Sequence, residues 1–231
     1  MSERFYFVHL GRMRYLERCS FFLNSTYSNV NCRRLKILPM YKPLFDYIER
    51  YSKSTLSQDE KEKIQSLFLQ KKLRKKQYFL EEGSSCPYTG FILKGATRQF
   101  SVDSHGLEYI LQLAVENWWI VDRNSYINQT PSKYFIEAWE NTELLVLPRR
   151  NLDPFLEIPA IKEMFWKMSE NNHIASVKRV DDAISLSALQ RYESFVELHP
   201  EMIQRFPLHL IASYLGISRE TLSRIRKQSL R

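Results

Sequence analysis

The feature that most constrains the fold is residues 207–227, where a glycine separates two short apolar-patterned segments. Gly216 stands where the chain has to turn through positive φ, a conformation that glycine adopts without a steric penalty. Ala212 allows two helices to approach closely, and Ser218 is of a residue type that caps a helix. The apolar residues that two such helices bury against each other are Ile211, Leu215, Ile217, Leu222 and Ile225. The pattern predicts a helix-turn-helix whose second helix spans residues 218–227.

The positive charge of the chain is concentrated at its two ends. Residues 1–39 hold seven basic and two acidic residues, residues 207–231 hold five and one, and residues 40–206 hold 22 and 23. A basic C-terminal module on a neutral body suits contact with phosphates, since neutralised phosphates dominate affinity for DNA. A merely solvated basic tail is the alternative, and the accompanying helix pattern argues against it.

The residue types that hold metals or perform catalysis lack the spacing of known sites. The three cysteines, Cys19, Cys32 and Cys86, are an odd number without a Cys-x-x-Cys pair, and the five histidines are scattered. We therefore expect no disulfide framework, no zinc, no iron–sulfur cluster and no cofactor. A metal-dependent β-barrel enzyme is the alternative, but no G-x-S-x-G, P-loop or dinucleotide motif is present, so we do not expect an enzyme. No eighteen-residue apolar segment occurs, so we expect no membrane span and a cytoplasmic protein.

The N-terminal part of the chain divides into an extension and two helices. Residues 1–39 show no sustained periodicity, and we expect a poorly ordered extension or the product of an upstream start, with a basic arm that contacts nucleic acid as the alternative. Apolar spacing over residues 44–51 predicts a short amphipathic helix. A capping box at residues 57–60 begins a second helix. The basic cluster at residues 71–76 is interpreted as a solvated helix end that leads into a strand, with contact to nucleic acid as the alternative.

From residue 77 to about residue 148 the chain changes to short β-rich runs separated by glycine and Asx turns. The expected strands are 78–81, 90–94, 97–102, 108–115, 118–121, 133–139 and 143–147. Regular spacing of this kind indicates an antiparallel sandwich, barrel or roll, which can enclose a small ligand. Trp118, Trp119 and Trp139 either line such a pocket or fill the core, and we expect the core.

After Pro159 apolar residues recur at spacings of three or four, which predicts one long helix. They are Ile161, Phe165, Met168, Ile174, Val177 and Ile184. Asn171 and Asn172 interrupt the series, and an asparagine in a helix seam fixes register and oligomeric state. We expect this helix to lie on a partner helix; packing only on its own domain is the alternative. Residues 185–187 are predicted to form a hinge, followed by a helix that ends near His199.

The order of helix, β-roll, long helix and helix-turn-helix resembles the Crp/Fnr superfamily of bacterial transcription regulators over about residues 41–227. The most specific part is Ser-Arg-Glu-Thr-Leu-Ser-Arg-Ile at residues 218–225, and residues 114–119 are similar to a variant in Bacteroidetes-type members. Gly83, Gly95 and Gly106 resemble turn glycines of the family's roll. The resemblance implies an α+β fold with four parts: an extension (1–39), a cyclic-nucleotide-binding-like jelly roll (40–157), a long dimerisation helix (158–186) and a helix-turn-helix domain (187–231).

The resemblance also implies a homodimer that reads a palindromic site in double-stranded DNA, with RNA polymerase as a further partner. In the family an Arg-Glu-x-x-x-Arg pattern reads a major-groove half-site, and here it falls on Arg219, Glu220 and Arg224. The chemistry of these residues agrees, since arginine donates two hydrogen bonds to guanine and glutamate accepts from cytosine N4. The remaining candidates for phosphate contact or helix capping are Ser218, Thr221, Ser223 and Lys227.

Two departures from the family pattern bear on regulation. Members that bind cyclic nucleotides carry an arginine for the phosphate, and the matching positions here are Asp122, Arg123, Ser132 and Lys133, so that Ser132 stands in place of the arginine. The Lys133 ammonium is a point charge and cannot make the bidentate hydrogen bonds of a planar guanidinium. We therefore do not expect cyclic AMP to bind, and the identity of the effector stays open. The second departure is a C-terminal wing that is missing or minimal. A ligand-sensing or cyclic-nucleotide-sensing module in which DNA binding is secondary is the competing hypothesis.

Overall fold

The computed structural model describes residues 36–229, with side chains as far as Lys227. Nearly all of the predicted extension therefore lies outside the described residues. The described part begins with a 3-10 turn, η1 (Pro39–Tyr41), and two helices, α1 (Lys42–Ser52) and α2 (Gln58–Leu67). The predicted capping box of α2 is confirmed, because the Glu60 N–H donates to the Ser57 hydroxyl at 3.3 Å and the Ser57 N–H donates to the Glu60 carboxylate at 2.8 Å.

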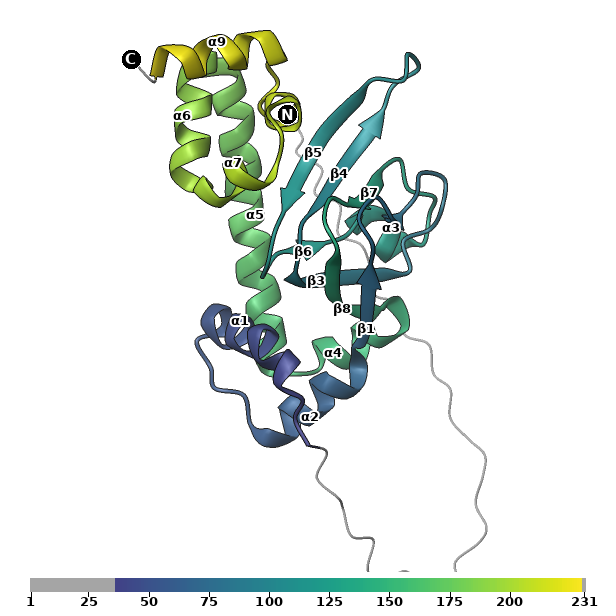
Figure 1. Cartoon of the computed structure of the whole chain (residues 1–231). Coiled ribbons are helices and arrows are strands. Elements are labelled where there is room, and N and C mark those ends of the chain that lie inside the picture. The colour runs from purple at the N-terminus through teal and green to yellow at the C-terminus, as the bar shows by residue number, and fades with distance from the viewer. Residues whose placement is uncertain (1–35, 230–231) are drawn as a thin grey trace, which may run out of the picture. The chain divides into compact units, whose positions relative to one another are not determined.

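The described strands form two four-stranded antiparallel sheets, ordered β1-β8-β3-β6 and β2-β7-β4-β5 (Figure 1). Their bounds are β1 (Leu69–Leu73), β2 (Tyr78–Leu80), β3 (Tyr88–Lys94), β4 (Thr97–Val102), β5 (Glu108–Ala114), β6 (Trp119–Ile120), β7 (Phe135–Ala138) and β8 (Thr142–Pro148). All but β1 lie where the β-rich runs predicted them, so the predicted antiparallel roll is confirmed.

Two segments differ from the sequence-based expectation. The interpretation of residues 71–76 as a helix end is wrong, because α2 ends at Leu67 and β1 pairs with β8. Partnering with β8 outweighs the weak β propensity of lysine, and the Lys71 ammonium also lies 5.2 Å from the centre of the Tyr88 ring. The segment between the strands expected at residues 118–121 and 133–139, which we expected to be a turn, contains a short helix, α3 (Arg123–Asn128), whose first turn is capped by the Asp122 carboxylate.

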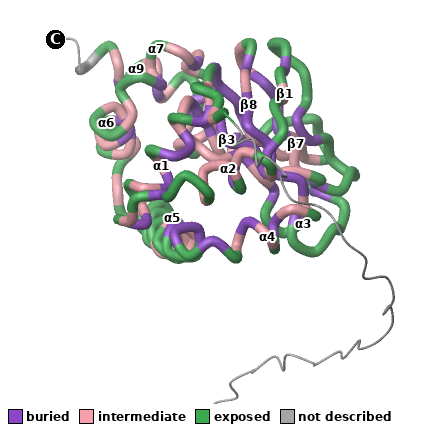
Figure 2. Tube along the Cα trace, turned by 90° about the horizontal axis from the view of Figure 1, so that it is seen from below, coloured by how far each residue is buried: buried purple, intermediate pink, exposed green. Residues whose placement is uncertain are grey.

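The long helix is confirmed as α5 (Pro159–Ser185), which follows η2 (Arg149–Asn151) and α4 (Leu152–Leu156). Its beginning packs on α1 and buries Ile161 and Met164. By contrast, every residue from 171 to 180 is exposed, and Figure 2 shows much of α5 in the colour of exposed residues. The apolar side chains of this segment, Ile174, Val177 and Val180, are therefore not buried by the described part of the chain.

The C-terminal helices are α6 (Ala188–Leu198), α7 (Pro200–Arg205), α8 (Leu208–Leu215) and α9 (Arg219–Ser229). Gly216 ends α8 in the left-handed region with φ +66°, and the Ile217 N–H donates to the Ala212 carbonyl at 3.0 Å. Leu222 and Ile225 of α9 are buried against Ile211 of α8. The predicted helix-turn-helix is therefore present, and α6 joins its core through Tyr192 and Phe195.

Two apolar cores hold the described residues together. One lies between the roll, α1, α2, α4 and the beginning of α5. The other joins the roll to the C-terminal helices, because Phe100 and Ile110 of β4 and β5 belong to the same cluster as Leu210 and Phe206. The described helix-turn-helix is thus docked on the roll of its own chain. The division into a sensor (40–157), a connecting helix (158–186) and a helix-turn-helix domain (187–231) stays a prediction.

Candidate DNA interface and effector cavity

The exposed face of α9 carries most of the residues predicted to contact DNA. The side chains of Arg219, Glu220, Ser223, Arg224 and Lys227 line one surface depression of about 410 Å³. They share a face because positions i, i+1, i+4, i+5 and i+8 fall on one side of a helix. The opposite side of α9 is buried, with Leu222 fully covered. Packing of the apolar side therefore orients the polar side outward.

The other two predicted DNA contacts, Ser218 and Thr221, lie at the beginning of α9. The Thr221 N–H donates to the Ser218 hydroxyl at 3.1 Å, and that hydroxyl lies 3.0 Å from Oγ1 of Thr221. The predicted capping role of Ser218 is therefore confirmed. A phosphate at this helix N-terminus would meet the remaining free N–H groups and the positive end of the helix dipole.

A cavity of about 800 Å³ lies where the roll, α3, α5 and the C-terminal helices meet. Gln99 and Gln112 of the roll form one wall, Asn172 of α5 forms another, and His199 and Tyr214 reach it from the C-terminal helices. None of the described residues that line the cavity is acidic, and Arg123 and Arg179 contribute positive charge. Burial lowers the pKa of His199, against the smaller raising effect of Glu201. The cavity thus favours a neutral or anionic ligand.

The four predicted effector residues do not form one binding surface. Ser132 and Asp122 are buried, and the Ser132 hydroxyl donates to the Asp122 carboxylate at 2.7 Å while it accepts the Tyr134 N–H at 3.0 Å. Arg123 is exposed and lines the cavity, whereas Lys133 is exposed and is not among the lining residues. The Ser132 hydroxyl is therefore already engaged, and a buried carboxylate stands beside it where an anionic ligand would need a cation.

The tryptophans have mixed roles. Trp118 and Trp119 both line the cavity, and both also pack on the apolar cores. Trp139 belongs to the core that joins the roll to the C-terminal helices, and its indole N–H donates to the Arg205 carbonyl at 3.1 Å. The expectation of core packing thus holds for Trp139, while Trp118 and Trp119 belong to both environments.

Within residues 36–229 no group of three or more His, Cys, Asp or Glu side chains is arranged to hold a metal ion. Cys86 is free and buried, and burial raises the pKa of its thiol; Cys19 and Cys32 lie outside the described residues. In the same part of the chain no helix is both long and apolar enough to span a bilayer.

Comparison with known proteins found a match only among solved structures. No protein-family model and no curated protein matches the chain. FixK2 from Bradyrhizobium japonicum is 17% identical over 70% of this chain and 83% of its own, with a TM-score of 0.60. The c-di-GMP-responsive global regulator CLP from Xanthomonas campestris is 10% identical over 75% and 92%, with a TM-score of 0.60. A CooA variant from Carboxydothermus hydrogenoformans is 18% identical over 78% and 82%, with a TM-score of 0.56.

These structural neighbours are regulators of the Crp/Fnr type. This chain has the Crp/Fnr fold. At identities below one fifth the likeness is one of fold, and it confirms the architecture that the order of elements predicted.

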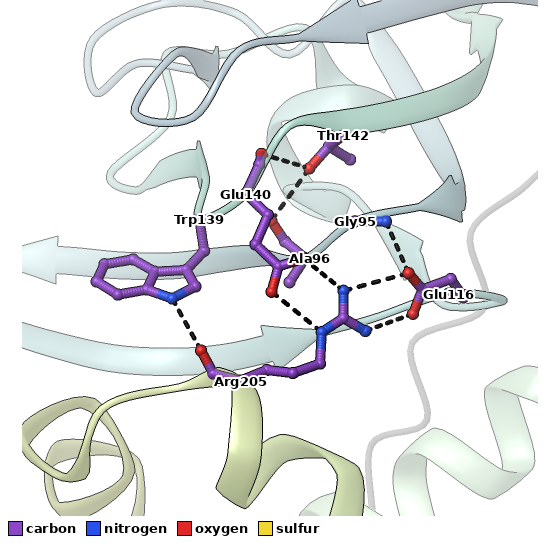
Figure 3. Close-up of polar contacts among 7 residues, drawn as sticks. All are labelled: Gly95, Ala96, Glu116, Trp139, Glu140, Thr142 and Arg205. Carbon is purple, nitrogen blue, oxygen red and sulfur yellow. Dashed lines mark hydrogen bonds and ion pairs between the residues drawn. The ribbon is translucent and has the colours of Figure 1, made fainter.

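Among the polar clusters that the sequence analysis missed is one centred on Arg205. Arg205 of α7 pairs with Glu116 and Glu140, which lie in turns of the roll (Figure 3). Burial by itself would raise the pKa of Glu116, but hydrogen bonds from Arg205 and from the Gly95 N–H outweigh it and hold this pKa below its usual range. The hydrogen bonds that the Arg205 guanidinium donates to Glu140 and Glu116 raise the pKa of Arg205. The residues are separated by 65 and 89 positions, so spacing along the sequence carries no signal of the cluster.

Proposed function

We propose that this chain is a sequence-specific, DNA-binding transcription regulator that reads the major groove with α9. The observation that carries the proposal is the outward polar face of α9, with Arg219 and Arg224 on the side opposite the buried Leu222. Arginine donates two hydrogen bonds to guanine O6 and N7, and Glu220 accepts from cytosine N4. Ser223 and Lys227 contact phosphates and fix the register of the helix on the duplex.

The regulator acts as a homodimer through the exposed part of α5. Ile174, Val177, Val180 and Ile184 recur every three or four residues, and their exposed fractions are 58, 55, 61 and 82%. An apolar stripe with this period is typical of a helix that packs on a second copy of itself. Two copies of α9 related by a two-fold axis require a near-palindromic site.

The cavity beside α5 holds the effector. Its apolar and aromatic lining, its two arginines and the lack of acidic groups among its described lining residues fit a small amphipathic molecule with a neutral or anionic polar group. Cyclic AMP is not expected, because Ser132 is bonded to Asp122 in place of the expected arginine. The protein is cytoplasmic, has RNA polymerase as a further partner, and catalyses no reaction.

Selection of bound duplexes from a random DNA library, with and without cell extract, tests this function. We expect a two-fold motif, and dependence on extract would reveal an effector. R224A should relax the preference at one guanine by about 1–3 kcal/mol, whereas K227A, the matched control on the same face, should weaken binding evenly across sequences. Absence of enrichment in both conditions contradicts the proposal and favours a sensing module without specific DNA binding.

The dimer is tested by sedimentation of the full chain. Replacing Val177 and Ile184 by aspartate should convert the dimer to a monomer and abolish binding to the two-fold site. K178A is the control, because Lys178 lies on the same helix and is paired with Asp182. Wild-type protein that sediments as a monomer at micromolar concentration contradicts the role assigned to α5.

A further inference from the structure

The helix-turn-helix is held against the free edge of β5. In the sheet order β2-β7-β4-β5 the strand β5 is at the edge, where backbone groups lack a strand partner. The Ile110 N–H donates to the Ser213 hydroxyl of α8 at 3.0 Å, and that hydroxyl donates to the Glu108 carbonyl at 3.3 Å. Arg179 of α5 donates to the Leu111 carbonyl of the same strand at 2.9 Å. Helices α5 and α8 therefore meet at one strand of the roll.

A second attachment lies at Arg205, the last residue of α7, which is followed by α8. Its guanidinium donates to Glu116 at 2.5 and 3.2 Å and to Glu140 at 2.7 and 3.1 Å, so both carboxylates are bound through two nitrogen–oxygen contacts (Figure 3). Glu116 also accepts the Gly95 N–H at 2.7 Å, and the Arg205 carbonyl accepts the Trp139 indole N–H at 3.1 Å. We call Arg205, Glu116 and Glu140 the Arg205 clamp.

The contacts of the clamp fix the orientation of the helix-turn-helix on the roll, in addition to attracting the two parts. Two-point contacts between a planar guanidinium and carboxylates have a fixed geometry, which a single lysine–carboxylate pair lacks. The Arg205 side chain is 23% exposed and the two carboxylates are 36% exposed, so the contacts are partly shielded from solvent. Rotation of the helix-turn-helix on the roll would break all of them together.

The docked arrangement leaves both the proposed DNA-binding face of α9 and the proposed dimer-forming stripe of α5 exposed. Arg219, Arg224 and Lys227 of α9 are exposed, and the α5 stripe at Ile174 and Ile184 is exposed as well. The clamp therefore covers neither DNA-contacting nor dimer-forming residues. What it determines is the direction of α9 relative to α5.

We propose that Arg205 is a positioning residue that sets the separation of the two half-sites accepted by the dimer. The inference rests on the proposed function, because it needs two copies of α9 held on a common two-fold axis. A change of two base pairs in the separation rotates one half-site by about 70° about the duplex axis. A rigidly held α9 cannot follow that rotation, whereas a loosely held one can.

The test measures affinity for duplexes that carry the selected half-site twice, at centre-to-centre separations of about 8 to 13 base pairs. For wild-type protein we expect a loss of at least about tenfold when the best separation is changed by two base pairs. R205M keeps the aliphatic stem and removes the guanidinium, and the difference between separations should shrink to within about threefold. Affinity for a duplex with a single half-site should stay unchanged, because α9 itself is intact.

Two further variants separate positioning from charge and from folding. K72M removes one positive charge and the exposed ion pair of Lys72 with Glu143 in the roll. Its affinity should depend on the separation of the half-sites as that of the wild-type protein does; we call this dependence the spacing profile. The double variant E116Q/E140Q removes the partners while Arg205 remains, and it should broaden the profile as R205M does. Hydrogen exchange at the Ile110 amide, which donates to Ser213, reports the docking without DNA and should be faster in both clamp variants.

The outcomes are distinct. Clamp variants that keep the wild-type spacing preference and wild-type exchange at Ile110 overturn the positioning role of Arg205 and leave the proposed function standing. Wild-type protein that binds DNA without any spacing preference overturns the positioning role as well. Wild-type protein that binds no DNA overturns the proposed function, and unchanged exchange in the clamp variants would then reject the clamp independently.

Discussion

Replacing Gly95 by alanine should destabilise the protein far more than the same change at Gly106, although both glycines lie in turns between strands of the roll. Both have positive φ, +101° and +80°. A β-carbon at Gly106 would meet nothing within 4 Å, whereas one at Gly95 would lie 2.6 Å from the Asn141 carbonyl oxygen and 2.7 Å from the Thr142 α-carbon. These are backbone atoms of the residue before β8 and of the first residue of β8, and they cannot move without shifting the strand.

The expected magnitudes follow from these contacts. Positive φ costs an L-residue about 1–2 kcal/mol, and the loss of glycine's freedom in the unfolded chain returns about 0.4–1 kcal/mol, which leaves about 1 kcal/mol for G106A. Overpacking against backbone adds about 1–3 kcal/mol, so G95A should cost about 2–4 kcal/mol. The Gly95 N–H also donates to Glu116, so G95A should loosen the Arg205 clamp.

The assay is urea unfolding followed by tryptophan fluorescence, with the midpoint converted to free energy through the slope. G95A should shift the midpoint at least about twice as far as G106A, with the slope unchanged in both. Equal shifts would refute the steric argument and show that positive φ alone decides the cost at these turns.

Three further outcomes are expected. The pKa of Glu116 in the folded protein lies below the ordinary value of 4.5, so the unfolding free energy of wild-type should exceed that of E116Q by a constant amount above pH 4.5. This difference should disappear as the pH falls through the lowered pKa. A difference that persists at lower pH contradicts the ion pair. L222A removes a fully buried side chain and should cost about 2–5 kcal/mol in thermal unfolding, with loss of DNA binding; a neutral result would reject the packing of α9 on α8. S218A removes the hydroxyl that accepts the Thr221 N–H and should cost about 0.5–2 kcal/mol, measured by urea unfolding against S223A, which caps no helix.

The elements with a strong local period were predicted well. Alternation and turn residues placed β4 at residues 97–102, where the structure has it, and Gly216 marked the turn between α8 and α9. The exceptions are β1, whose lysine-rich sequence is held as a strand by its pairing with β8, and α3, which is only six residues long. In each case an interaction that is distant in sequence, or a single cap, outweighed local propensity.

The candidate DNA interface was predictable because its residues lie on one helix or cap it, and along a helix a spacing of three or four positions fixes which side chains share a face. The cavity was only partly predictable, since Arg123 was named in advance whereas Arg179 and Tyr214 were not. Those residues come from helices far along the chain, and no local pattern records that they converge.

The sequence by itself determined the order of elements, the turn at Gly216, the cap at Ser218 and the polar face of α9, because each depends on neighbours within a few residues. Only the tertiary structure decided where the helix-turn-helix rests. Its position depends on the free edge of β5 and on Arg205 meeting two carboxylates from turns of the roll. Contacts between distant segments form only when the whole chain has folded, so no local sequence pattern predicts their geometry.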